Sequence, residues 1–424
     1  MNSIVYKDSV LGESCRFVTL PNGLKIYVAE KRDFNTSYAI FGTKYGSIDT
    51  EFSRDGENFT KVPEGIAHYL EHKLFESEDG DAFARYSLTG ANANAFTSFD
   101  RTCYLFSCAD RLYDNLEILL DFVQTPYFTE QTVQKEQGII GQEIRMYDDS
   151  APWCVLFNML SAMYENHPVK IDIAGTVESI AKINADLLYE CYNTFYNPAN
   201  MFFCIAGNFD ADEVIAFIEK SIKPTAPVTV TRRAPKESEG VLLPYVEKEM
   251  MVAKPIFCFG FKEKCEGERT LRESLLSDML LEIIAGEASP LYERMVENRL
   301  LNDEFESEYF QGNGYAVALW QGESDDPKAV EAAIKAEIER LKREGIDEEL
   351  FESVKRALYG AAVKRYNTVD GIVMSLVDCA MDGSGPFDDI EMLREVKKSE
   401  VEERLLLLDP DKTVLSVIKP KKVD

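Results

Sequence analysis

The sequence has few histidines, no paired cysteine motif and no long apolar run. Only three of its 424 residues are histidine. The nine cysteines are scattered and include no CxxC, which argues against a disulfide framework and against a thiolate zinc site. No run of about 18 apolar residues is present, and the first residues lack the apolar core of a signal peptide. We therefore expect a cytoplasmic protein without a membrane segment.

Positive charge is also scarce relative to negative charge. The chain has 46 lysines and arginines against 74 aspartates and glutamates, which gives a formal net charge of -28. Nucleic-acid phosphates and acidic membrane surfaces repel such a chain unless its basic residues are concentrated in one patch. The basic clusters VTRRAPK and KPKKV are short. The composition therefore predicts no nucleic-acid partner and no membrane partner.

The length predicts two domains, because one hydrophobic core rarely serves a chain of 424 residues. The stretch KPTAPVTVTRRAPKESEG is rich in proline and polar residues and has no helical period, so we interpret it as a linker. The predicted division is a first domain at 1–224, a linker at 225–240 and a second domain at 241–424.

The first half opens with strands and closes with helices. FVTLPNGLKIYVAE reads as a strand, an Asn22-Gly23 turn and a second strand, and SYAIFGTKYGSI reads as a further strand. NANAFTSFDRTCYLFSC alternates as strands do. Helices are expected at about 110–123 and 130–147.

The same order of elements returns in the second half. IFCFGFKE and GYAVALWQGES read as strands, Asp326 and Pro327 start a helix that Gly345 ends, and another helix is expected at about 348–366. The repetition suggests an ancient duplication. The predicted fold class is α+β, with two similar halves that each pack an antiparallel-rich sheet against helices.

The segment GIAHYLEHKLFE contains two of the three histidines, four residues apart. On a helix, His68, Glu71 and His72 project from one face. Two imidazoles one turn apart can bind one zinc ion, and the glutamate between them can act as a general base toward water. A polar helix face that carries histidines by chance is the alternative, but the H-x-x-E-H spacing favours a metal site.

A catalytic zinc ion needs a third protein ligand. His167 is the simplest candidate, but a carboxylate is preferred. In KEQGIIGQEIRMYDD, Glu136 and Glu143 are seven residues apart and share a helix face, so that one can ligate the metal while the other orients a histidine. Acids at this spacing are common in a chain this acidic, so spacing alone leaves the choice open.

These residues resemble the pitrilysin/insulinase family of zinc metallopeptidases, the inverzincins, and the resemblance covers nearly the whole chain. It rests on LPNGLKIYV, PEGIAHYLEHKLFE, NANAFTSFDRTCYLF, EQGIIGQEIRMYDD, HPVKIDIAGTVESI and FYNPANMFFCIAGNFD, which occur in the order typical of the family. The resemblance implies that His68, His72 and Glu143 bind one zinc ion. It further implies that Glu71 activates water and that Glu136 is a supporting acid.

The resemblance also implies a place for the substrate. The NAFT segment of the family lies on an edge strand that pairs with extended peptide, so Asn94, Ala95 and Phe96 are the expected peptide-binding residues. An ordinary sheet strand is the alternative. His167 lies in the HP segment of the family, where a structural role is expected.

The second half departs from the first and from the family. Val354 and Ala361 stand opposite the two glutamates of the first half, so no second zinc site is expected. Family members place an arginine and a tyrosine where this chain has Val296 and Asp303. The two residues expected to hold the substrate carbonyl are therefore missing.

The chain has about half the length of single-chain family members, whose chamber closes from four repeats. The resemblance therefore implies a half-shell that pairs with a homologous subunit, with a heterodimer favoured and a homodimer possible. The expected function is that of a zinc endopeptidase which cleaves peptides or unfolded segments in a closed chamber. A non-proteolytic scaffold or binding subunit with vestigial zinc is the alternative.

Overall fold

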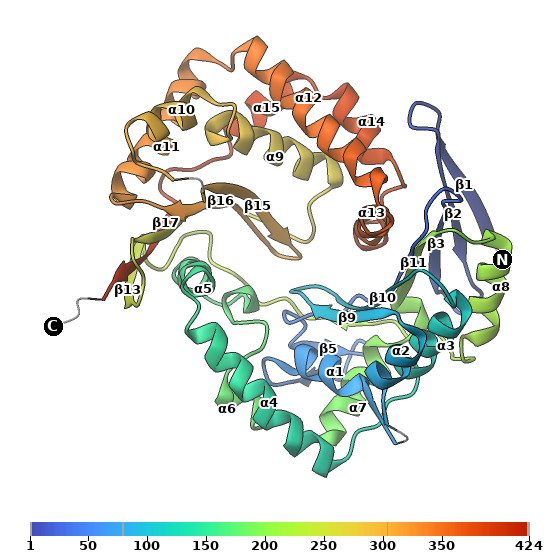
Figure 1. Ribbon diagram of the computed structural model, residues 1–424. Helices are drawn as coiled ribbons and strands as arrows, with labels where there is room; N and C mark the ends of the chain where they lie inside the picture. The colour runs from blue at the N-terminus through green and yellow to red at the C-terminus, as the bar shows by residue number, and fades with distance from the viewer. Residues whose placement is uncertain (1, 79, 303, 422–424) are drawn as a thin grey trace. The chain divides into compact units, whose positions relative to one another are not determined.

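The computed structural model describes residues 2–78, 80–302 and 304–421. The chain forms two compact units, and each unit is assembled from three separate segments (Figure 1). Unit 1 consists of Met1–Ile144, Asp172–Arg233 and Val363–Asp388, and unit 2 consists of Arg145–Ile171, Ala234–Ala362 and Asp389–Asp424. Each half of the chain thus contributes one helical segment to the other unit. The predicted division into domains at 1–224 and 241–424 with a linker at 225–240 stays a prediction.

A seven-stranded sheet forms the centre of unit 1. Its strands lie in the order β1 (Asn2–Asp8), β2 (Glu13–Thr19), β3 (Lys25–Glu30), β11 (Met201–Gly207), β4 (Ser37–Thr43), β10 (Thr102–Cys108) and β9 (Asn92–Thr97). Only β3 and β11 run parallel, and the other neighbours are antiparallel. Strands β1 and β9 therefore form the two edges of this sheet.

A five-stranded sheet forms the centre of unit 2. Its strands lie in the order β13 (Tyr245–Met250), β17 (Thr413–Pro420), β14 (Ile256–Lys262), β16 (Tyr315–Glu323) and β15 (Glu306–Gly312). Again only the first pair, β13 and β17, runs parallel. This is the order and direction of β3, β11, β4, β10 and β9 in unit 1, so the predicted fold class of two similar α+β halves is confirmed.

The helices of unit 1 surround its sheet. They are α1 (Ile66–Leu74), α2 (Ala82–Thr89), α3 (Leu112–Val123), α4 (Glu130–Asp148), α6 (Val177–Ile180), α7 (Ala185–Phe195), α8 (Ala211–Ser221) and α13 (Val369–Asp382), of which α4 continues beyond the unit. Helix α13 comes from the second half of the chain and packs on β11, β4 and β3. Its buried face includes Ile372, Val373, Leu376 and Val377, so it completes the hydrophobic core of unit 1.

The helices of unit 2 follow the same plan. They are α5 (Ala151–Met163), α9 (Leu271–Ala285), α10 (Pro290–Glu297), α11 (Pro327–Glu344), α12 (Glu348–Lys364), α14 (Asp388–Glu395) and α15 (Lys398–Leu405). Helix α5 comes from the first half of the chain and packs on β17, β14 and β13. These strands match the three that α13 covers in unit 1. The exchange of helices is therefore reciprocal.

Local signals placed several element boundaries correctly. The Asn22-Gly23 turn joins β2 to β3, with Gly23 at a φ of 93°. Asp326 caps α11 by accepting a hydrogen bond from the Ala329 amide (3.1 Å), and Gly345 ends this helix at a φ of 80°. No helix in the described part of the chain has the length and apolarity of a membrane span.

Candidate metal centre

Helix α1 begins where the chain passes very close to a second segment. Gly65 precedes the helix at a φ of 87°, and a Cβ atom there would lie 2.4 Å from the carbonyl oxygen of Ala174. Only glycine fits this approach. The Tyr69 hydroxyl then donates a hydrogen bond to the carbonyl oxygen of Val133 in α4. These contacts hold α1 against α4, the helix that carries the two glutamates.

His68, Glu71 and His72 lie on α1, and Glu143 approaches both imidazoles. The Nε2 atom of His68 lies 3.6 Å from Glu143 Oε1, and the Nε2 atom of His72 lies 3.5 Å from Glu143 Oε2. One ligand atom from each of these three residues lies within 4.8 Å of the other two. His68 is only 7% exposed. The structure thus brings together the three residues that the resemblance implies as zinc ligands.

The three side chains fit a zinc ion in chemistry and in spacing. Zinc prefers imidazole nitrogen, carboxylate oxygen and thiolate ligands, and ligand atoms about 2.0–2.2 Å from a tetrahedral ion lie about 3.3–3.6 Å apart. The distances of 3.5 and 3.6 Å from Glu143 to His72 and His68 agree with this spacing. They are too long for strong hydrogen bonds. The geometry therefore suits a shared ion better than direct pairing.

Glu136 orients His72 from behind. Its Oε1 atom lies 3.0 Å from Nδ1 of His72, and Glu136 precedes Glu143 by about two turns on the same face of α4. When Nδ1 donates to this carboxylate, Nε2 keeps a free lone pair for a metal. The Nδ1 atom of His68 is buried without a hydrogen-bond partner in the described part of the chain. The two imidazoles therefore differ in their surroundings. A carboxylate orients the ring of His72, whereas only the packing of neighbouring residues surrounds Nδ1 of His68.

Burial and charge set the protonation of the imidazoles. Burial lowers the pKa of His68 to about 3, and its neighbour His72 adds to the shift. Burial also lowers the pKa of His72, but the hydrogen bond with Glu136 and the nearby carboxylates outweigh burial, so its pKa lies above the usual value. Burial raises the pKa of Glu136, but the bond with His72 outweighs it and the net pKa is lowered. Burial therefore favours the neutral, metal-binding form of His68, whereas the carboxylates around His72 favour its protonated form.

Glu71 faces the same site and is 7% exposed. Burial raises the pKa of its carboxyl group, although the hydrogen bond from Thr97 opposes the shift. The Thr97 hydroxyl donates this bond to Glu71 Oε2 over 2.7 Å. The sequence reasoning did not single out Thr97, even though it directly follows the three residues expected to bind peptide.

Those three residues, Asn94, Ala95 and Phe96, lie in β9 at the edge of the sheet. They pair with Leu105, Tyr104 and Cys103 of β10, and β9 is the last strand in the sheet order. No strand in the described part of the chain pairs with its outer edge. Backbone groups on that edge are the kind that an extended peptide uses to add a strand.

The remaining histidine lies in unit 2, outside the cluster. His167 Nε2 is 3.0 Å from the carbonyl oxygen of Asn313, and its Nδ1 accepts a hydrogen bond from the Val169 amide (3.1 Å). The side chain is almost fully buried. These contacts are those of a structural histidine.

The matching positions of unit 2 hold no metal ligands. Val354 is buried in α12, and Ala361 is exposed on the same helix. Among the described residues, His68, His72 and Glu143 form the one group with metal-ligand spacing. Val296 lies in the last turn of α10 and is 41% exposed, and Asp303 lies outside the described residues.

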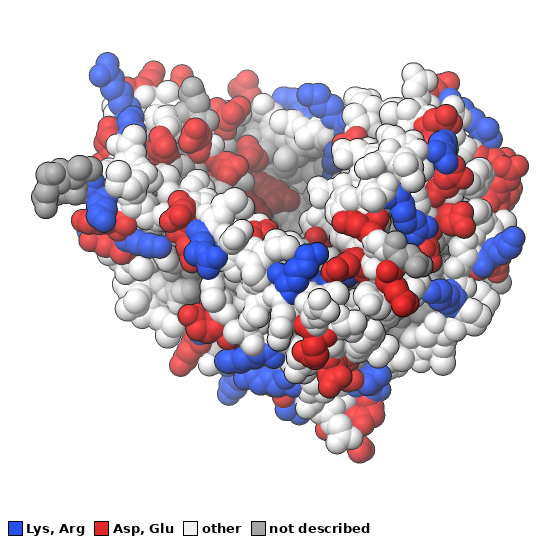
Figure 2. Space-filling view, turned by 60° about the horizontal axis from the view of Figure 1, so that its bottom comes forward, with Lys and Arg blue, Asp and Glu red and all other residues white. Residues whose placement is uncertain are grey.

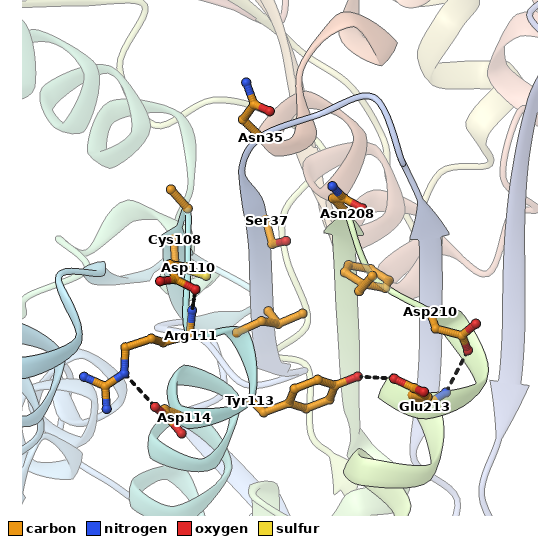
Figure 3. A pocket seen from close by; sticks show the side chains of 13 residues that line it. Asn35, Ser37, Cys108, Asp110, Arg111, Tyr113, Asp114, Asn208, Asp210 and Glu213 are labelled. Carbon is orange, nitrogen blue, oxygen red and sulfur yellow. Dashed lines mark hydrogen bonds and ion pairs between the residues drawn. The ribbon is translucent and has the colours of Figure 1, made fainter.

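A cavity of about 470 Å³ lies elsewhere in unit 1, beside the first turns of α3 and α8 (Figure 3). Its charged and polar side chains pair with one another. Arg111 Nε lies 2.7 Å from Asp114, and the Tyr113 hydroxyl donates to Glu213 over 3.1 Å. Asp210 accepts a hydrogen bond from the Glu213 amide, which caps α8.

Figure 2 shows basic side chains interspersed with acidic ones over the face in view.

Known proteins resemble this chain in sequence and in fold. The family model described as "Insulinase (Peptidase family M16)" matches residues 60–177, which include all the metal-site residues, and the model described as "Peptidase M16 inactive domain" matches residues 182–358. The chain belongs to the insulinase family, peptidase family M16. The expected family is thereby confirmed.

Individual relatives agree with this assignment. The Bacillus subtilis protein YmfH, described as an uncharacterised zinc protease, is 41% identical over 399 residues, which span 92% of this chain and 93% of YmfH. The crystal structure of an M16-like peptidase from Alicyclobacillus acidocaldarius has a TM-score of 0.93 at 32% identity and covers 99% of this chain and 100% of that one. Pitrilysin has a TM-score of 0.76 at 16% identity. This chain matches over 99% of its own length but only 46% of pitrilysin, so it corresponds in fold to one half of that protein.

Proposed function

We propose that this protein is a zinc-dependent endopeptidase that cleaves extended peptides or unfolded segments within a chamber. The observation that carries the proposal is the convergence of His68, His72 and Glu143, with Glu71 between the histidines on the same helix face. The open edge of β9 beside this cluster supports a peptide substrate. The names of the relatives point to the same reaction class.

Each side chain has a defined role in this proposal. His68, His72 and Glu143 hold one zinc ion, which supplies Lewis acidity and lowers the pKa of water to about 7. Glu71 accepts the proton from the attacking water and passes it to the leaving amine. Glu136 keeps Nδ1 of His72 protonated so that Nε2 faces the metal. Asn94, Ala95 and Phe96 hold the peptide in an extended form along β9.

Glu71→Gln tests the chemistry. The amide has the size of the carboxylate but cannot accept the proton, so cleavage of a quenched peptide should fall by about 10²-fold or more while bound zinc is retained. Glu190→Gln is a matched control, since it changes a partly exposed glutamate of unit 1 that pairs with Arg54. Wild-type turnover in zinc-loaded Glu71→Gln would exclude Glu71 as the base.

We also propose that a second half-shell completes the chamber. The match to only 46% of the pitrilysin chain supports this, as does Val296 at the place where the family has an arginine. A homologous subunit with that arginine and the tyrosine would supply donors to the developing oxyanion, so mixing should raise kcat/KM by about 10². A heterodimer is favoured over a homodimer. Full activity of the chain alone at every dilution would contradict the need for a partner.

A non-proteolytic binding subunit is the second candidate function, favoured by Val296 at that same place. Under this alternative, zinc binds but neither the chain alone nor the reconstituted pair cleaves peptide through this site. Equal turnover of the pair with wild-type chain and with Glu71→Gln would support it. We also propose the cytoplasmic location that the sequence predicts.

A further inference from the structure

Thr97 links the strand at the edge of the sheet to the side chain of Glu71. It is the last residue of β9 and pairs with Thr102 of β10. Its hydroxyl donates to Glu71 Oε2 over 2.7 Å. An ionised carboxylate only accepts hydrogen bonds, so the threonine must be the donor. Since the bond has a neutral donor and a charged acceptor, it belongs to the stronger class of hydrogen bonds.

The neighbouring hydroxyl leaves this arrangement undisturbed. Thr102 is fully buried, and its Oγ1 donates to the carbonyl oxygen of Tyr45 over 2.9 Å. The distance between the two threonine hydroxyls is 3.5 Å, which makes any bond between them weak. The proton of Thr102 is therefore directed away from Thr97, and the proton of Thr97 is directed toward Glu71.

The hydrogen bond distinguishes the two oxygens of Glu71. Oε2 is held by the hydroxyl, whereas the described residues offer no hydrogen bond to Oε1. A glutamate side chain has three rotatable bonds, and a single fixed oxygen removes most of its orientational freedom. Oε1 is then the oxygen available for a proton from water.

We propose that Thr97 is a positioning residue that orients the Glu71 carboxylate for its role as general base. The inference rests on the proposed endopeptidase function. Asn94, Ala95 and Phe96 precede Thr97 on the same strand, so a peptide that adds to the edge of β9 contacts the backbone that carries the hydroxyl. Pairing with β10 fixes the backbone of Thr97, and the Thr97 hydroxyl holds Oε2 of Glu71 so that Oε1 is left for the reacting water.

Thr97→Val tests the role in catalysis. Valine keeps the shape of threonine and favours a strand, but it lacks the donor. We expect kcat to fall by about 10–100-fold with KM within about twofold, because a misplaced base affects the transition state and not ground-state binding. Thr97→Ser should restore most of kcat. Thr43→Val is the control, since it removes a buried hydroxyl of the same sheet that donates to Phe195 (2.7 Å), and it should lower thermal stability without lowering kcat.

A structural readout tests the orientation without any activity measurement. Crystal structures of the metal-free wild type and of metal-free Thr97→Val should differ in the Glu71 carboxylate, ordered in the first and rotated or disordered in the second. Zinc binding should be equal in the two proteins. An unchanged Glu71 in Thr97→Val, or an unchanged kcat, would overturn the inference. A wild-type protein that binds zinc but cleaves nothing with its partner would instead overturn the proposed function, and the crystal structures would still decide whether Thr97 orients Glu71.

Discussion

The two units share a fold but use their buried charges in different ways. Helices α4 and α12 begin at Glu130 and Glu348, and each follows an equivalent strand and helix, β10 and α3 in unit 1 and β16 and α11 in unit 2. The seventh residue of α4 is Glu136, which pairs with His72, whereas the seventh residue of α12 is Val354, which is buried in an apolar core. Equivalent positions of the two helices thus hold a glutamate that pairs with a histidine in unit 1 and an apolar core residue in unit 2.

The buried charges of unit 2 serve its structure. Lys262 donates to Glu237 over 3.0 Å and to the carbonyl oxygens of Met163, Ser238 and Gly240. Burial of a charge is costly unless it is paired, and in unit 2 the pairs hold loops to strands. In unit 1 the pair of His72 and Glu136 borders a position that suits a metal. The fold permits a site, and the side chains of one unit create it.

The largest expected effect is the loss of zinc affinity when one of the proposed ligands of unit 1 is removed. His72→Ala removes one of the three proposed zinc ligands, so zinc affinity should fall by more than about 100-fold, the upper range for loss of a supporting residue alone. Peptide cleavage should fall with it. Metal analysis after equilibration with a chelator measures the change.

His167→Ala is the matched control for this substitution. It removes the one histidine of unit 2, which bonds to Asn313 outside the cluster. The variant should lose stability but keep its zinc. Full metal occupancy in His72→Ala, or equal metal loss in both variants, would refute the assignment of the ligands.

A smaller effect should come from the residue behind His72. Glu136→Ala removes the carboxylate 3.0 Å from Nδ1, so zinc affinity should fall by about 10–100-fold while the ligands remain. Val354→Ala changes the equivalent position of unit 2 and should affect only stability, since it opens a small space in a packed core. Competition with a zinc chelator compares the two. A loss of affinity in Val354→Ala as large as that in Glu136→Ala would show that the effect is structural.

The smallest expected effect is a pH-dependent change in Tm when Glu237, the partner of Lys262 in unit 2, is replaced. Burial alone raises the pKa of Glu237, but the backbone amides of residues 165–167 and Lys262 outweigh it and lower the pKa to about 2 from 4.5. A carboxyl with a lowered pKa stabilises the fold above pH 4.5, and the contribution is lost as the pH falls toward 2. Glu237→Gln should therefore lower Tm by about 2–4 °C near pH 7 and by less as the pH approaches 2.

Glu239→Gln controls for a general change of charge, because Glu239 is exposed and pairs only with Lys264 at the surface. It should shift Tm little at any pH, and neither variant should change zinc binding. A Tm difference between Glu237→Gln and wild type that grows on acidification would have the wrong sign for a carboxyl held ionised by its partners.

Local patterns in the sequence placed many elements because the signals act over a few residues. The helix expected at 130–147 is α4 at Glu130–Asp148, and the helix from Asp326 to Gly345 is α11. Cap residues and turn residues act through adjacent backbone groups, so they can be read directly. The sequence reasoning did not single out α5, whose residues are apolar over much of its surface, because a helix without a polar face shows little periodicity.

The sequence by itself determined that His68, Glu71 and His72 share a helix face, because residues three and four apart on a helix always do. It did not determine whether His167 or one of the two glutamates of α4 meets these histidines. Tertiary packing decided this by placing α4 against α1, so that Glu143 reaches both Nε2 atoms and Glu136 reaches Nδ1 of His72. The packing also brought Thr97 to Glu71 across 26 residues of chain. Contacts between elements depend on how side chains pack in three dimensions, and no periodic signal in the sequence records them.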